Sequence, residues 1–249
     1  MENLNLTGGV LIIGSLYWDK ENNRPEWREK FLMKNDIKVK IPIRYGRKSS
    51  NDVFTMVFSK SISDNNFGTG YVKQLKRTKI NNWNDLEFEV LKMAKAEGIR
   101  KTIANPIPIF KKEWCTMSIL FNPRTINEEK KKFIIEEWIK RIEKDYPEND
   151  NANYKFGNEE SVLNENYTLN FDWFQPTDEK DLDQLNNIDF LICSVTKQKN
   201  DTNNYPTTKE IVKSIKNDNK RYYFKNNRKY NISTFEDDKI LENLVALNS

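Results

Sequence analysis

Short apolar runs separated by polar turn segments make up most of the first half of the chain. These runs are rich in β-branched and aromatic residues, which is typical of strands. Strands are predicted over residues 10–13, 39–45, 53–59, 70–75, 115–121 and 188–196. The first half is therefore expected to be mostly sheet.

Apolar positions take a helical spacing in the second half. Residues 128–145 place several apolar side chains on one helical face: Phe133, Ile134, Trp138, Ile139 and Ile142. A second helix is expected to open at the capping box of residues 207–210, and a last helix spans about residues 237–247. Residues 148–166 are rich in Asn, Asp and Glu and are predicted as a loop. Strands and helices together predict an α+β fold.

A further helix is predicted over residues 85–97. Asn84 and Glu87 fit its N-cap and capping-box positions, and Gly98 fits the position directly after its last turn. Apolar residues along this helix follow spacings of four and three: Leu86, Val90 and Met93. The next step of four reaches Glu97, so its carboxyl group is expected to face the core or a cavity.

This carboxyl group is a candidate for acid–base catalysis. Burial disfavours the anion and the helix C-terminus presents partial negative charge to it, so both effects are expected to raise the pKa of Glu97. A raised carboxyl pKa suits proton transfer near neutrality. The alternative is that Glu97 lies at a frayed helix end, where it reaches water or pairs with Lys101.

The segment Gly14-Ser15-Leu16 directly follows the first predicted strand. A glycine at this point predicts a tight turn and lets the backbone come close to a ligand. The N–H groups that follow can then converge on an anionic group such as a carboxylate. The alternative is an ordinary glycine turn after a core strand.

Composition excludes several kinds of function. The 249 residues, 37% of them apolar, are enough for one globular domain with a sizeable core. Basic residues number 41 and acidic residues 37, interspersed along the chain, which argues against a dedicated polyanion binder. The chain has no histidine, which excludes Ser-His-Asp and Cys-His catalysis. Acid–base chemistry must therefore use Glu, Asp, Lys or Tyr.

The two cysteines and the N-terminus bear on the compartment. Cys115 and Cys193 are far apart and cannot alone form a zinc site or a disulfide framework, so both are expected to be buried thiols. The apolar run of residues 10–13 is much shorter than the apolar core of a signal peptide or a membrane span. A cytoplasmic protein without membrane contact is expected.

Two motifs, in this order along the chain, resemble those of the gamma-glutamylcyclotransferase-like family: Ile13-Gly14-Ser15-Leu16 and Ala96-Glu97-Gly98-Ile99. Members of that family carry a Tyr-Gly-Ser-Asn or Tyr-Gly-Ser-Leu turn after the first strand, and an acid–base glutamate commonly followed by glycine. Residues 42–47 and 54–58 lie where the second and third strands of the family would be. Ile13 stands where the family has tyrosine, so contacts of that phenol are missing.

The resemblance covers residues 9–120 and implies a fold. It implies a small mixed β-barrel, closed or nearly closed, with flanking helices, which would protect the strand edges. Residues 121–249 exceed the family core and are expected as an extension packed on it through Trp138 and the last helix. The whole chain is then a single domain.

The resemblance also implies an activity. A gamma-glutamyl amide is attacked by its own α-amine, which closes the ring of 5-oxoproline and releases an amine; proximity supplies much of the catalysis. The segment Ile13–Leu16 would bind substrate, with N–H groups of Gly14, Ser15 and Leu16 on its α-carboxylate. Glu97 would take the ammonium proton and return one to the leaving amine. Neither a metal nor another cofactor is required, and the leaving amine is left open.

Arg44 and Tyr45 are further candidates for substrate binding. A strand alternates sides, so the two side chains are expected to point in opposite directions, and an arginine can bind a carboxylate through two parallel hydrogen bonds. Arg47 is interpreted as a surface charge. Ser15 is expected to shape the turn, because no histidine is present to activate it as a nucleophile.

Two other functions remain open at this point. One is a non-catalytic member of the same fold that binds a small amino-acid-derived ligand or a partner protein. The other is nucleic-acid binding through residues 216–230, where basic and aromatic residues alternate as in single-strand grooves. A half-buried strand with a solvated face gives the same pattern, and the acidic run Glu236-Asp237-Asp238 follows closely. The sequence contains no indication of the oligomeric state.

Overall fold

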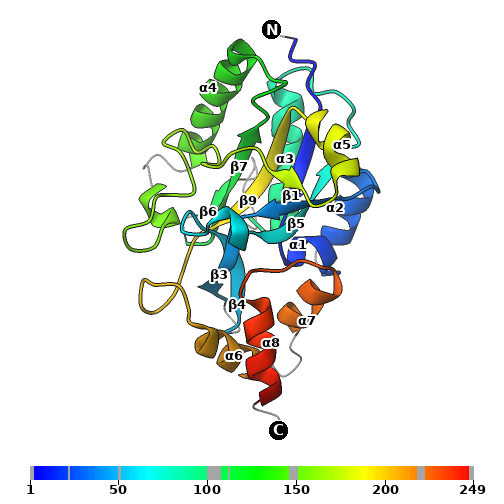
Figure 1. The fold of residues 1–249 in the computed structure, drawn as a ribbon. Coiled ribbons are helices and arrows are strands. Elements are labelled where there is room, and N and C mark those ends of the chain that lie inside the picture. The colour runs from blue at the N-terminus through cyan, green and yellow to red at the C-terminus, as the bar shows by residue number, and fades with distance from the viewer. Residues whose placement is uncertain are drawn as a thin grey trace.

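A seven-stranded sheet runs through the middle of the fold (Figure 1). The computed structural model describes residues 3–21, 23–49, 52–99, 108–111, 113–145, 151–217 and 222–246. Across this sheet the strands lie in the order β6 (Phe110–Lys111), β7 (Cys115–Phe121), β9 (Phe190–Thr196), β1 (Gly8–Ile12), β5 (Gly68–Gln74), β2 (Ile37–Ile41) and β8 (Gln175–Pro176). β1 and β9 are parallel, and the other neighbouring strands are antiparallel. A separate ladder pairs β3 (Ile43–Lys48) with β4 (Phe54–Phe58).

Helices pack around both sheets, which confirms the α+β class. The α-helices of the described residues are α1 (Ser15–Trp18), α2 (Arg24–Phe31), α3 (Trp83–Glu97), α4 (Glu128–Asp145), α5 (Leu182–Asn186), α6 (Thr208–Asn217), α7 (Tyr222–Lys229) and α8 (Asp237–Ala246). Short 3₁₀ turns occur at Asp64–Asn66, Asn151–Tyr154 and Glu179–Asp181. In Figure 1, α3 and α4 lie at one end of the molecule, while α6 and α8 lie at the other, below β3 and β4.

The central strands are buried on both faces, which explains why their sequences are continuous apolar runs. Val10 and Ile12 of β1 pack in an apolar cluster with residues of α3 and α4. Leu11, which points to the opposite face, packs in a second cluster with residues of β4, α6 and α8. Cys115 and Cys193 are buried free thiols, as expected.

Closure of the sheet into a barrel is not confirmed. β6 and β8 form the two edges of the seven-stranded sheet, and no pairing among the described residues joins them. Each of these edge strands has only two residues. Short edges leave little unpaired backbone for another chain, so they give the protection that barrel closure was expected to give.

The chain beyond residue 121 does more than pack on a core of residues 9–120. Its strand β9 lies between β1 and β7 near the middle of the sheet. Trp138 of α4 is buried and packs edge-on against Trp83, with ring centroids 6.3 Å apart. Ile240 and Leu244 anchor the last helix, α8, in the second apolar cluster. Residue 247, the expected end of that helix, lies outside the described residues.

Proline divides one predicted strand. The run of residues 39–45 is split at Pro42 into the end of β2 and the start of β3. Proline has no N–H group for a ladder hydrogen bond, so the chain leaves the large sheet there and enters the β3–β4 ladder.

The N-terminus of α3 differs from the prediction because a different asparagine caps it. The side-chain oxygen of Asn82 accepts a hydrogen bond from the Asp85 amide at 3.0 Å, so the helix begins at Trp83. Glu87 does not close a capping box, because it accepts a hydrogen bond from Nε of Arg141 at 2.6 Å. The other end is confirmed: Gly98 ends the helix with φ +89°.

The structure also shows the conformation of two later segments, the predicted loop of residues 148–166 and the basic segment of residues 216–230. In the predicted loop of residues 148–166, residues 155–166 form neither a helix nor a strand, as expected, whereas residues 151–154 form a 3₁₀ turn; residues 148–150 lie outside the described residues. The basic segment of residues 216–230 is helical at residues 216–217 and 222–229, so the interpretation as a half-buried strand is wrong for these residues. Residues 218–221 of that segment are not described.

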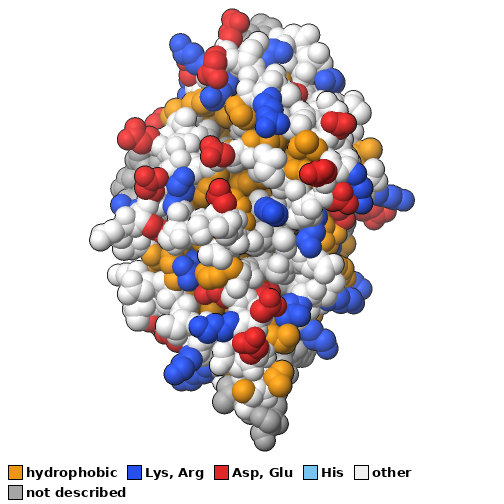
Figure 2. All heavy atoms as spheres, viewed as in Figure 1, with side chains coloured by type: hydrophobic (Ala, Val, Ile, Leu, Met, Phe, Trp, Pro, Cys, Tyr) orange, Lys and Arg blue, Asp and Glu red, His pale blue; other side chains and the backbone are white. Residues whose placement is uncertain are grey.

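Charged side chains of both signs are interspersed over the face seen in Figure 2, in keeping with the sequence pattern. In the part of the chain that the structure describes, none of the helices combines the length and the apolar composition that crossing a bilayer requires.

Candidate active site

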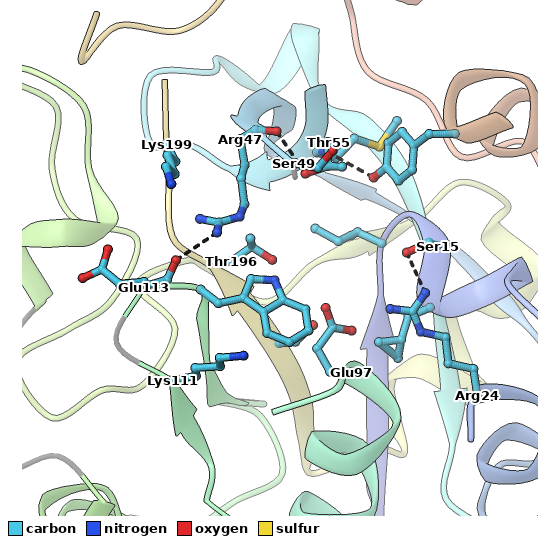
Figure 3. Close-up of a pocket in the computed structure, with 16 residues that line it drawn as sticks. Ser15, Arg24, Arg47, Ser49, Thr55, Glu97, Lys111, Glu113, Thr196 and Lys199 are labelled. Atoms are coloured by element: carbon cyan, nitrogen blue, oxygen red, sulfur yellow. Dashed lines mark hydrogen bonds between the residues drawn. The ribbon is translucent and has the colours of Figure 1, made fainter. Parts of the chain in front are cut away.

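A cavity of about 550 Å³ lies at the carboxyl ends of the parallel strands β1 and β9 (Figure 3). Carboxyl ends of neighbouring parallel strands are a common place for ligand sites in mixed sheets. Its walls are completed by five elements: the turn after β1, the end of α3, α2, the β3–β4 ladder and α7. Its lining residues are Ile13, Ser15, Leu16, Arg24, Arg47, Ser49, Thr55, Met56, Glu97, Lys111, Glu113, Trp114, Ser194, Thr196, Lys199 and Tyr223.

The predicted turn after the first strand forms one wall. Gly14 has φ 63° and ψ −141°, a conformation that an L side chain rarely adopts, and Ser15 begins the short helix α1. The first N–H groups of a helix have no acceptor within the helix itself, so those of Ser15 and Leu16 can serve a ligand. A Cβ added at Gly14 would overlap the phenolic oxygen of Tyr223, so glycine is required here by packing as well as by φ.

Glu97, the last residue of α3, lines the same cavity as Ser15 and Leu16. The helical phase predicted from Leu86, Val90 and Met93 is confirmed, since all three are buried. The Glu97 side chain keeps some exposure through the cavity but is otherwise surrounded by protein. Burial raises the pKa of its carboxyl group to about 7, against a smaller lowering effect of the Arg24 charge.

None of the residues that the structure describes forms a hydrogen bond with the Glu97 carboxylate. Lys101, its alternative partner, lies outside those residues. In Figure 3 the carboxylate points into the cavity, with Ser15 and Arg24 on one side and Lys111 and Glu113 on the other. A carboxyl group with a pKa near neutrality and no committed partner is suited to exchange protons with a bound ligand.

Arg24 forms hydrogen bonds to both the turn after β1 and the end of α3, a role that the sequence did not indicate. Its Nη1 donates to Ser15 Oγ at 3.1 Å and to Asp19 Oδ2 at 2.6 Å. Its Nε donates to the carbonyl of Ala96, directly before Glu97, at 3.2 Å. The guanidinium therefore sets the position of the turn relative to Glu97. Its partner in α3 lies far along the chain, so no local pattern could have identified it.

Arg44 and Tyr45 lie away from the cavity. The Arg44 guanidinium packs over the Tyr205 ring, 4.1 Å from its centroid, and an Nη2 of Arg44 pairs with Glu236 at 3.3 Å. Tyr45 is 1% exposed and lies in the apolar cluster beside Asp237, whose carboxyl pKa burial raises to about 6. Both side chains serve the packing of the C-terminal segment on β3.

Arg47, interpreted from sequence as a surface charge, lines the cavity instead. A β-bulge between Tyr45 and Arg47 shifts the register of β3 against β4, so the simple alternation of sides fails at this point. Nη1 of Arg47 donates to the carbonyl of Lys197 at 2.8 Å, and Nη2 donates to that of Glu113 at 2.9 Å. Burial lowers its pKa.

The charges around the cavity favour an anionic ligand. Its lining includes the four cationic residues Arg24, Arg47, Lys111 and Lys199, against the two carboxylates of Glu97 and Glu113. Glu113 is largely exposed, at 73%, and lies 3.9 Å from Lys197 Nζ. Among the described residues, no group of three or more Cys, Asp or Glu side chains has an arrangement that could hold a metal ion.

Most aromatic residues of the basic segment, residues 216–230, make contacts within the protein and do not form an exposed row. Tyr223 lines the cavity, Phe224 is buried, and the carbonyl of Tyr230 accepts a hydrogen bond from the Tyr71 hydroxyl at 2.9 Å. Tyr222 is 45% exposed. A row of exposed rings, which a single-strand groove uses for stacking, is therefore not formed by these residues.

We expect Glu97→Gln to raise the thermal stability of the protein above neutral pH. The pKa of the Glu97 carboxyl group is about 7 in the folded protein and has the ordinary value of 4.5 in the unfolded chain. Between pH 4.5 and 7 the folded protein therefore binds more protons at this group than the unfolded chain does. Wild-type stability therefore falls as the pH rises through that window, whereas glutamine has no charge to bury. Thermal unfolding should place the variant roughly 5 °C above wild type at about pH 8.

The two proteins should melt within about 1 °C of each other near pH 4.5, where both side chains are neutral. Asp237 and Glu236, whose pKa values burial also raises, titrate in both proteins and cancel in the comparison. Equal melting temperatures at about pH 8 would contradict the buried setting of Glu97.

Comparisons of the chain with protein-family models, with curated proteins and with solved structures found no match.

Proposed function

We propose that this protein is a gamma-glutamylcyclotransferase-like enzyme that converts a gamma-glutamyl amide to 5-oxoproline and a free amine. One observation carries the proposal: Glu97, with a pKa of about 7, and the turn Ile13–Leu16 line a single cavity. These are the residues of the two motifs on which the family resemblance rests. The family fold is part of the same proposal.

The turn provides the anchor for the substrate. N–H groups of Ser15 and Leu16 are free of helix acceptors, and the guanidinium of Arg24 lies beside Ser15. An α-carboxylate bound there receives hydrogen bonds from fixed donors and the attraction of a nearby cation. The glutamyl group then extends along the cavity toward Glu97.

Glu97 exchanges the protons of the reaction. Its carboxylate takes a proton from the substrate α-ammonium, and the amine nitrogen attacks the γ-carbonyl carbon, forming the C–N bond of the five-membered ring. The protonated Glu97 then gives this proton to the amide nitrogen as the original C–N bond breaks. The ring nitrogen still carries a second proton, which the ionised Glu97 accepts and passes to the departing amine, so 5-oxoproline keeps a single N–H. The substrate supplies both nucleophile and electrophile, so the protein mainly holds the reactive conformation.

The cavity has room for the amine portion beyond the glutamyl group. Its volume of about 550 Å³ is in the range of sites that enclose whole small-molecule ligands. Arg47, Lys111 and Lys199 line the part of the cavity across from Ser15 in Figure 3.

The test is direct detection of 5-oxoproline. Purified protein is incubated with a panel of gamma-glutamyl compounds that share the glutamyl end and differ in the amine, and the products are separated by chromatography. We expect 5-oxoproline and the free amine in equal amounts from at least one compound. Glu113→Gln, which removes the exposed carboxylate of the same cavity, should retain the activity.

A wild-type protein that binds one of these compounds without forming 5-oxoproline would contradict the enzyme proposal. That result would support the non-catalytic binding function, with Glu97 as an anchoring group. Titration calorimetry on the same panel distinguishes the two outcomes.

A further inference from the structure

Tyr223 of α7 extends to the turn after β1. Its phenol lines the cavity together with Ile13 and Glu97, and the phenolic oxygen lies directly over the α-carbon of Gly14. Its ring packs edge-on against that of Trp18, with centroids 6.1 Å apart. The phenol is therefore held at the cavity wall by contacts on several sides.

A backbone donor points at the phenolic oxygen. The Met56 amide donates a hydrogen bond to it at 3.2 Å. The nearby Asn227 side chain has a lowering effect on the pKa of the phenol, which is smaller than the raising effect of burial. The amide oxygen of Asn227 accepts from Trp18 Nε1 at 2.6 Å, and its Nδ2 donates to Met56 Sδ at 4.0 Å.

The phenolic proton is then free for a ligand. The hydroxyl oxygen accepts the hydrogen bond of the Met56 amide, and no acceptor for its own proton is found among the described residues. Burial raises the pKa of Tyr223 to about 12, so the group stays protonated near neutrality. It is a neutral donor, fixed in place beside the turn and Glu97.

We infer that the Tyr223 hydroxyl donates a hydrogen bond to the γ-carbonyl oxygen of the substrate and stabilises the negative charge that develops there. This inference rests on the proposed function. In that function the turn binds the α-carboxylate and Glu97 serves the two nitrogens, so the γ-carbonyl oxygen is the remaining substrate oxygen that needs a donor. A fixed donor costs no reorganisation when the charge forms, which is the basis of oxyanion stabilisation.

Tyr223→Phe tests this assignment, because it removes the hydroxyl group and keeps the ring over Gly14. We expect kcat for 5-oxoproline formation to fall by about 10²–10³-fold, with KM changed by less than about threefold, because the bond strengthens in the transition state. Tyr222→Phe, on the same helix and 45% exposed, is the matched control and should leave both constants unchanged.

A binding measurement supplies a second readout, which does not depend on turnover. Methionine sulfoximine has a tetrahedral sulfur and an oxygen at the γ position, whereas glutamine has a planar amide there. By calorimetry, Tyr223→Phe should weaken binding of methionine sulfoximine by about tenfold or more and that of glutamine by less than about threefold.

The outcomes separate this inference from the proposed function. If wild type forms 5-oxoproline and Tyr223→Phe does so at the same rate, the role of Tyr223 is overturned and the function stands. If wild type forms no 5-oxoproline, the function fails. The inference then fails with it, unless Tyr223→Phe binds methionine sulfoximine about tenfold more weakly than wild type does. That result would support the hydrogen bond to the γ oxygen without the enzyme activity.

Discussion

Glu97→Gln is expected to lower kcat for 5-oxoproline formation by about two to four orders of magnitude and to leave KM nearly unchanged. Glutamine keeps the size and shape of the side chain but cannot exchange a proton. Glu113, the other carboxylate among the described residues that line the cavity, is largely exposed, so we do not expect it to replace Glu97. Steady-state kinetics of wild type, Glu97→Gln and the control Glu113→Gln would measure the effect.

The pH dependence of the wild type gives an independent check on the same residue. Glu97 must be ionised to accept the ammonium proton, and burial raises its pKa to about 7. The value of kcat/KM should therefore rise as the pH increases through about 7, and ionisation of the substrate ammonium adds a second limb at higher pH. A variant with wild-type kcat, or a profile that is flat through neutrality, would remove Glu97 from the mechanism.

Gly14→Val is expected to abolish ligand binding. Gly14 has φ 63°, where an L side chain is strained, and even a single added Cβ would overlap the Tyr223 hydroxyl. A branched side chain would displace the turn whose N–H groups are proposed to bind the α-carboxylate. Calorimetry with glutamine or a gamma-glutamyl compound measures the loss, and circular dichroism establishes that the variant is folded.

The chain offers two controls for this change. Gly157 also has positive φ, at 49°, but a Cβ there would meet nothing within 4 Å, so Gly157→Ala reports backbone strain alone. In the double variant Gly14→Ala/Tyr223→Phe the overlapping oxygen is gone, so part of the binding lost in Gly14→Ala should return. Unimpaired binding by Gly14→Val would mean that the turn is purely structural.

Local patterns in the sequence predicted the parts of the site that depend on local geometry. Helical periodicity sets the direction of every side chain on a helix, so Leu86, Val90 and Met93 were sufficient to place Glu97 on the inner face. The break of an apolar run at Gly14 likewise predicted the end of β1 and its turn.

The remaining parts of the site depend on contacts that no local pattern specifies. Arg24 meets Ala96, and Tyr223 meets Met56, across long separations along the chain. Arg47 was assigned to the surface because charged side chains are mostly exposed, and neither the bulge nor the tertiary contacts that bring it to the cavity leave a local pattern. The strand of residues 188–196 was predicted, but its position in the sheet was not, since strand order depends on tertiary packing.

The position of β9 has a consequence for the order in which the protein can be assembled during synthesis. Among the described strands, the β6–β7 pair is joined to β1 only through β9, which leaves the ribosome after about three quarters of the chain. Until then the nascent chain holds two separate sheet fragments, with apolar edges at β1 and β7 that have no neighbour. Such edges are sites of aggregation during folding, and pairings between distant segments form slowly. Both motifs of the candidate site are therefore synthesised early, but the cavity between them can form only after the C-terminal segment has been made.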